Sequence, residues 1–183
     1  GANLVRARLW HTPDWTNYST LEDVQRTFTR ARDVGMHTLL DFHYSDNWAD
    51  PGRQEIPAAW EGFDAAALAE AVYDYTYETL DTLHQADLTP AFVQVGNEIN
   101  SGPLKEVVES DWPRDARIIN AGIQAVRDFA AATGTDPRII LHVAQPENTT
   151  WWFTQAEAHA VTDFDVIGIS YYPQWSSYSI ADM

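Results

Sequence analysis

Short apolar stretches alternate with amphipathic stretches along this chain of 183 residues. Five stretches have the length and apolar content of buried strands, and they lie at residues 4–10, 38–44, 92–98, 139–144 and 166–172. Four stretches of helical periodicity lie at residues 21–34, 65–86, 115–132 and 150–161. Gly35 and Gly134 follow the first and third of these directly and suit C-terminal caps. The alternation predicts one α/β domain over residues 1–183, built around a parallel sheet.

Each predicted strand has one apolar face and one face with polar or ionisable side chains. The polar positions are Arg6, Arg8, Asp41, His43, Gln94, Glu98, His142, Ser170 and Tyr172. An open sheet covered by helices on both faces should be apolar on both, whereas a closed barrel can hold the polar groups of a site inside its upper layer. The pattern therefore favours a (β/α)8 TIM barrel. The alternative is that these polar side chains only satisfy one another.

The length of the chain limits how much of a barrel it can contain. A complete eightfold barrel needs roughly 250 residues. This chain has 183 residues and five strand–helix units. We expect an incomplete barrel that is part of a larger protein.

Composition excludes several function classes. The net charge is −16 and Lys105 is the only lysine, so we expect no nucleic-acid partner. No apolar run is long enough to span a membrane, and no signal-peptide pattern is visible, so we expect no membrane partner. Cysteine is absent, no His-x-His pair occurs, and phosphate-binding glycine loops and the G-x-S-x-G elbow are missing. We expect no metal and no cofactor.

The third predicted strand stops at Asn97 and Glu98. Barrel enzymes keep their chemistry at the carboxyl ends of their strands. A retaining glycosidase uses two carboxyl groups roughly 5–5.5 Å apart, one as acid/base and one as nucleophile. Glu98 is the predicted acid/base. The amide of Asn97 can orient a sugar hydroxyl or the carboxylate itself.

The loop after the second predicted strand mixes polar, aromatic and turn residues, as a rigid ligand-facing loop does. His43, Asp46 and Trp48 are its predicted substrate-binding residues. His43 can donate to a sugar hydroxyl or to a neighbouring carboxylate, and the alternative is a satisfied core histidine. Asp46 can also cap a turn, and Asp50, before a proline, is expected to do so.

Four further residues complete the predicted site. Arg8 points inward and needs a carboxylate partner, which is either the ionised nucleophile or Asp41. His142 lies on the polar face of its strand and is assigned to substrate binding. Tyr172, facing inward, can hydrogen-bond the nucleophile, and Trp175 can form the floor of a sugar subsite.

The chain resembles glycoside hydrolase family 53, the endo-β-1,4-galactanases. The run HYSDNWADP at residues 43–51 is long enough to be a specific signature of that family. Further matching stretches lie at residues 5–10, 39–52, 72–76, 93–99 and 165–173. Residues 102–108 depart from the family pattern, which usually has a tryptophan there, so one subsite tryptophan is expected to be missing.

The resemblance implies the fold and the chemistry. It implies an eightfold barrel of which this chain is strands two to six. It implies retaining, endo-acting cleavage of β-1,4-galactan, with Glu98 as acid/base, Asn97 on the sugar next to the scissile bond and Arg8 supporting the nucleophile. The family's nucleophile, a glutamate at the end of strand seven, would follow Met183.

Two alternatives to galactan hydrolysis remain open. One is another retaining barrel glycanase that acts on mannan, cellulose or xylan, since fold alone does not fix specificity. The other is a catalytically incomplete piece that binds sugar weakly at most, and we expect the isolated chain to be inactive. By resemblance, the full-length protein is expected to be a secreted monomer whose partner is the galactan polymer.

Overall fold

The computed structural model describes residues 1–105 and 109–182. Its order of elements is β1 (Leu4–Leu9), α1 (Leu21–Asp33), β2 (His37–Phe42), η1 (Ala58–Trp60), α2 (Ala65–Gln85), β3 (Phe92–Val95), α3 (Trp112–Thr133), β4 (Arg138–Ala144), α4 (Pro146–Ala158), β5 (Val166–Ser170) and η2 (Ile180–Asp182). All five predicted strands and all four predicted helices are present. Part of the segment 102–108, where the sequence departs from the family pattern, lies outside the described residues.

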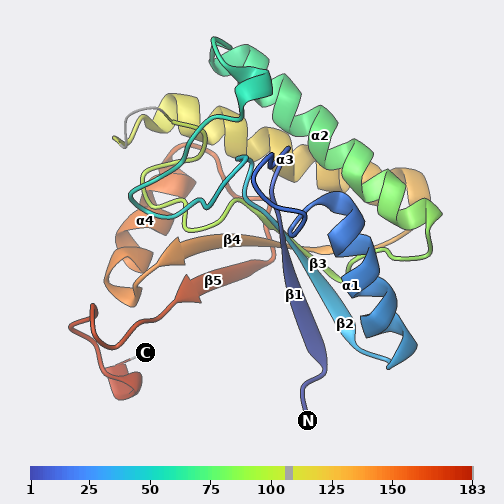
Figure 1. Ribbon diagram of the computed structural model, residues 1–183. Coiled ribbons are helices and arrows are strands. Elements are labelled where there is room, and N and C mark those ends of the chain that lie inside the picture. The colour runs from blue at the N-terminus through green and yellow to red at the C-terminus, as the bar shows by residue number, and fades with distance from the viewer. Residues whose placement is uncertain (106–108, 183) are drawn as a thin grey trace.

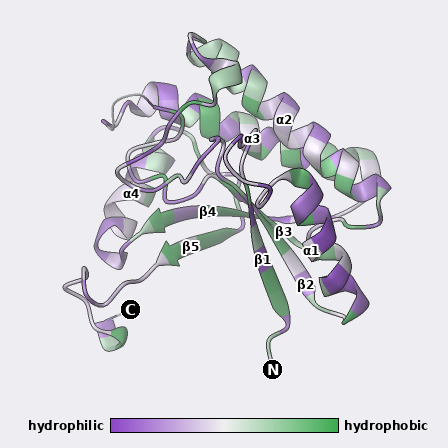
Figure 2. Ribbon diagram, in the orientation of Figure 1, coloured by the Kyte–Doolittle hydropathy of each residue, from purple (hydrophilic) through white to green (hydrophobic). Residues whose placement is uncertain are grey.

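The five strands form one parallel sheet in the order β1-β2-β3-β4-β5. The four helices lie along one side of this curved sheet, and both chain ends lie on the other side (Figure 1). The strands are mostly hydrophobic, whereas the helices mix hydrophobic and hydrophilic residues (Figure 2). Among the described helices, none combines the length and the apolar content that crossing a membrane requires.

Local sequence signals explain where the helices begin and end. Thr20 caps α1 by accepting a hydrogen bond from the Asp23 N–H, and Asp64 caps α2 with bonds from two backbone N–H groups. Gly134 ends α3 in the left-handed region at φ 71°, as predicted for a glycine cap. Helix α4 begins at Pro146, four residues before the predicted start, because proline suits a first helical position.

The core lies between the sheet and the helices that cover it. Large side chains from both layers are fully buried there: Phe28, Phe42, Tyr44, Leu68, Leu80, Leu83, Phe129 and Trp152. The three inner strands β2, β3 and β4 are buried beyond their first residue. The outer strand β5 differs, because Ile167 and Ile169 are 47% and 42% exposed.

Candidate active site

A hollow of about 220 Å³ opens where the carboxyl ends of the five strands meet. Seven of the nine predicted site residues line it: Arg8, His43, Trp48, Asn97, Glu98, His142 and Tyr172. Asp46 and Trp175 do not line it. The polar face of the sheet and the loops above it therefore form one site around Glu98.

The backbone after β3 turns both Asn97 and Glu98 toward this hollow. The strand ends at Val95, three residues earlier than predicted, because Gly96 takes a φ of +87°. A Cβ at Gly96 would lie 2.6 Å from Ile99 Cγ2, so the turn requires a glycine. Glu98 itself has a φ of 48°, which costs a non-glycine residue free energy. Strict alternation would have turned Asn97 outward, and the turn explains why both neighbours line the site.

Asn97 is held on both ends of its amide. Its Oδ1 accepts hydrogen bonds from Arg6 Nη2 at 2.8 Å and from Gln94 Nε2 at 3.3 Å. Its Nδ2 donates to the Ala49 carbonyl at 2.7 Å. Asn97 is only 8% exposed, so this amide is fixed before any sugar arrives.

Asp41 is the buried charge beneath the site. It is 0% exposed, and its carboxylate meets Arg6 Nη2 at 2.8 Å, His43 Nε2 at 3.1 Å and Gln94 Nε2. The predicted alternative of an Arg8–Asp41 pair is wrong, because Arg6, two residues earlier, makes the pair. The positive Arg6 and the donors around Asp41 compensate for its burial.

His43 has both ring nitrogens occupied by the protein. Nδ1 accepts from the Ala49 N–H at 3.0 Å, so Nε2 carries the hydrogen that it donates to Asp41. Of the two donor roles predicted for His43, the contacts match donation to a neighbouring carboxylate. Its ring orders Asp41 and the start of the following loop.

Arg8 lies against aromatic rings. Its guanidinium carbon is 4.0 Å from the ring centre of Trp48 and 4.9 Å from that of Trp10. Within the described residues it makes no ion pair, and its Nε is buried without a hydrogen-bond partner. A cation in this position has donor capacity left for an anionic group in the hollow.

His142 connects β4 to the Asn97–Glu98 turn. Its Nδ1 lies 2.9 Å from Asn97 Oδ1 and 3.3 Å from the Glu98 N–H, and its Nε2 lies 3.0 Å from Ser170 Oγ. Burial lowers the pKa of His142 to about 4, although the negative charge of Asp41 acts in the opposite direction. The ring is therefore neutral at neutral pH.

Tyr172 and Trp175 lie together at the open side of the hollow, and only Tyr172 lines it. Their ring centres are 5.2 Å apart, and their exposed fractions are 42% and 71%. Tyr172 lines the hollow, as its predicted inward direction requires. Trp175 packs against Tyr172 at an interplanar angle of 56° and is the more exposed of the two rings.

Asp46 braces the loop above β2 and does not reach the hollow. Its carboxylate accepts hydrogen bonds from the Thr12 and Ala58 N–H groups at 2.8 and 2.9 Å, and it lies 3.5 Å from His11 Nδ1. These contacts hold together the loops after β1 and β2. The turn-capping role predicted for Asp50 matches the structure, since its Oδ1 accepts from the Gly52 N–H at 2.8 Å.

Sequence reasoning left out four residues of the site, namely Arg6, Asp41, Gln94 and Ser170. Gln94 is the centre of the buried network, with contacts to Arg6, Asp41, Asn97 and His142. All four lie on the polar face that alternation already identifies, so that signal was sufficient to find them. No group of three or more His, Cys, Asp or Glu able to hold a metal occurs in residues 1–105 and 109–182.

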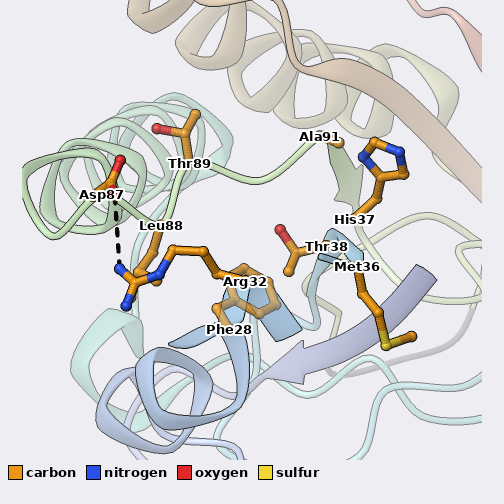
Figure 3. Close-up of a pocket in the computed structure, with 9 residues that line it drawn as sticks. All are labelled: Phe28, Arg32, Met36, His37, Thr38, Asp87, Leu88, Thr89 and Ala91. Atoms are coloured by element: carbon orange, nitrogen blue, oxygen red, sulfur yellow. Dashed lines mark ion pairs between the residues drawn. The ribbon is translucent and has the colours of Figure 1, made fainter. Parts of the chain in front are cut away.

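A second hollow of similar volume, about 210 Å³, lies at the opposite ends of the strands (Figure 3). Phe28, Leu88 and Thr38 line it, and its one ion pair joins Arg32 and Asp87 at 3.7 Å. Both charged groups are solvent-exposed, and neither belongs to a buried network. Chemistry, rather than size, therefore places the candidate active site around Glu98.

Comparison with known proteins agrees with this placement. The chain matches the family described as Glycosyl hydrolase family 53 over residues 1–183. It is 51% identical to an arabinogalactan endo-beta-1,4-galactanase of Cellvibrio japonicus, over 100% of this chain and 50% of that protein. It is 39% identical to a probable arabinogalactan endo-beta-1,4-galactanase A of Aspergillus terreus, over 97% and 52%. The chain thus spans about half the length of these relatives.

Solved structures support the fold. One of the two fungal beta-1,4-galactanases has a TM-score of 0.87 at 33% identity, and the match covers 96% of this chain and 54% of that one. The Ignisphaera aggregans GH53 catalytic domain has a TM-score of 0.85 at 33% identity, over 95% and 50%. These domains are TIM barrels, so the predicted fold class is confirmed and the five-stranded sheet is part of such a barrel. The chain belongs to glycosyl hydrolase family 53.

Proposed function

We propose that the protein containing this chain is a retaining endo-β-1,4-galactanase with Glu98 as its acid/base. Family membership and relatives named as arabinogalactan endo-beta-1,4-galactanases support the substrate class. The observation that carries the catalytic assignment is the position of Glu98. It lines a hollow whose other walls are the fixed amide of Asn97, the cation of Arg8 and the aromatic face of Trp48.

The proposed reaction has two steps. Glu98 first donates its proton to the glycosidic oxygen, while a nucleophilic carboxylate forms a bond to the sugar and the leaving chain departs with that proton. Glu98 then removes a proton from water, which attacks the same carbon and releases the nucleophile. Asn97 orients the sugar next to the scissile bond, and Trp48 offers a face for stacking.

Retention requires a second carboxyl group. Among the described residues that line the hollow, the only other carboxylate is Asp50, which already accepts a hydrogen bond from Gly52. We propose that the nucleophile comes from a segment that the longer relatives contain and that this chain does not span. Arg8, with its free donor capacity, and Tyr172 would contact that carboxylate.

The relatives favour galactan over the other polymers. A GH30 xylanase C of Talaromyces cellulolyticus has a TM-score of 0.58 at 13% identity, which concerns the fold alone. The relatives with a substrate in their names at 39–51% identity are galactanases. We further propose that the full-length protein is extracellular and monomeric, as a galactan-degrading enzyme of this family would be.

The test is Glu98→Gln in the full-length gene product, assayed on galactan, mannan, xylan and cellulose. Acid/base catalysis contributes about 10²–10⁴-fold, so the variant should lose that much of its rate on galactan. The matched control is Glu61→Gln, because Glu61 is exposed and lies outside the hollow. A wild-type enzyme that prefers another polymer would refute the substrate, and a Glu98→Gln variant with near wild-type rates would refute the role.

A further inference from the structure

The turn that carries Asn97 and Glu98 is strained, and its own strand does not hold it. Gly96 and Glu98 both have positive φ values, +87° and 48°. A non-glycine residue in this region is strained and persists only where the surroundings fix it. The carbonyl groups of Asn97 and Glu98 lie beyond the end of β3. Some other part of the chain must therefore hold these two peptide groups.

The side chain of Gln54 makes that contact. Its Nε2 donates to the Asn97 carbonyl at 3.0 Å and lies 3.2 Å from the Glu98 carbonyl. The same nitrogen lies 3.0 Å from the carbonyl of Asp50, which lines the hollow. The two N–H donors of this one amide nitrogen thus face three carbonyl oxygens, two of which belong to the Asn97–Glu98 turn. Gln54 itself does not line the hollow.

Gln54 is fixed in turn by a buried ion pair. It is 2% exposed, and its backbone carbonyl accepts from the Lys105 N–H in an isolated antiparallel bridge. The Lys105 ammonium pairs with Asp115 of α3 at 2.8 Å, and both side chains are at most 5% exposed. The single lysine of the chain therefore anchors the loop of Gln54 to the helix behind the site.

We propose that Gln54 is a positioning residue that sets the direction of Glu98 by holding the Asn97 and Glu98 peptide groups. This inference rests on the proposed role of Glu98 as acid/base. A side chain without a hydrogen-bond donor cannot replace it, since three carbonyl oxygens face the same point. Loss of the amide should let the turn relax and move the Glu98 carboxyl away from the glycosidic oxygen.

The experiment compares Gln54→Met with wild type in the full-length enzyme on two substrates. On galactan, whose leaving group needs a proton, kcat/KM should fall about 10–100-fold. On 2,4-dinitrophenyl β-1,4-galactobioside, whose leaving group needs none, kcat/KM should stay within about threefold. Azide attacks the glycosyl-enzyme without base catalysis, so it should restore kcat of the variant on the aryl substrate.

Two further variants complete the design. Gln124→Leu is the control, because Gln124 is an exposed glutamine of α3 remote from the turn, and it should behave as wild type on both substrates. Gln54→Asn retains an amide that is one methylene shorter. It should show the same selective loss if Gln54→Met does not fold, as judged by circular dichroism.

The outcomes separate the two proposals. Equal losses on both substrates, or no loss on galactan, in a folded Gln54 variant would overturn the role of Gln54 alone. A wild-type enzyme with no activity on galactan would overturn the proposed function and the Gln54 inference with it.

Discussion

The hollow around Glu98 has two sides that differ in construction. On the side of β1 to β4, Asp41, Gln94 and Asn97 are at most 8% exposed and bonded to one another. On the side of β5, Tyr172 and Trp175 are 42% and 71% exposed. One side is therefore fixed by the fold in advance, whereas the other presents free aromatic faces. This difference predicts that the fixed side governs the chemical step and the open side governs binding of the polymer.

The largest effect is expected from Gln94→Leu, which breaks the fixed side at its centre. Gln94 is 2% exposed and contacts Arg6, Asp41, Asn97 and His142. The variant should lose about 100-fold in kcat/KM on galactan and about 2–3 kcal/mol of unfolding free energy, because buried partners lose their hydrogen bonds. Steady-state kinetics and urea unfolding measure both quantities. Unchanged kinetics would mean that the network only supports the fold.

The next effect is the pH dependence of stability caused by His142. Its pKa is about 4 in the folded state and about 6.5 when unfolded, so the folded state favours the neutral ring. The free energy of unfolding that this pKa difference contributes is fully present above pH 6.5. It is lost as the pH falls toward 4, because the unfolded chain then binds a proton that the folded chain does not. Between pH 7 and 4, wild type should lose roughly 3 kcal/mol more than His142→Gln. His37→Gln, at an exposed histidine, is the control and should follow wild type.

The variant Asp46→Ala tests whether Asp46 stabilises the loop above β2 or binds the substrate. The variant leaves the Thr12 and Ala58 N–H groups without their acceptor. We expect it to lose about 1–2 kcal/mol of unfolding free energy, with kcat/KM on galactan reduced no more than about fivefold. Thermal unfolding and initial rates measure these effects. A large loss of activity with unchanged stability would instead mean that Asp46 binds the substrate.

The smallest effect is expected from Trp175→Ala on the open side. The side chain is 71% exposed, so its removal should change the unfolding free energy by less than about 0.5 kcal/mol. Loss of a stacking face should raise KM for galactan about threefold without changing kcat. A fall in kcat with unchanged KM would contradict the division between the two sides.

Much of this arrangement could be predicted from the sequence. Apolar periodicity predicts all five strands and all four α-helices, and the polar alternation identifies the face of the sheet that carries the site. The resemblance to family 53 is confirmed by the match over residues 1–183. The boundaries that failed have local causes, such as the turn at Gly96 and the proline start of α4.

The pairing of polar groups could not be predicted from alternation. Arg6 and Arg8 share one face of β1, and the register places Arg8 opposite Asp41 although Arg6 makes the ion pair. Gln54 and Asp46 lie in a loop without period, so no pattern indicated that one binds the Glu98 turn and the other braces Thr12. Such contacts depend on how loops meet in three dimensions.

The most direct test of the role of Glu98 is the product that Glu98→Ala forms with azide. If Glu98 is the acid/base, azide should accelerate cleavage of 2,4-dinitrophenyl β-1,4-galactobioside by the full-length variant. The product should be the β-galactosyl azide, since azide attacks the glycosyl-enzyme from the face that water uses. NMR distinguishes the two anomers. An α-azide product would mean that Glu98 is the nucleophile. No acceleration in a folded variant would mean that Glu98 takes no part in the reaction.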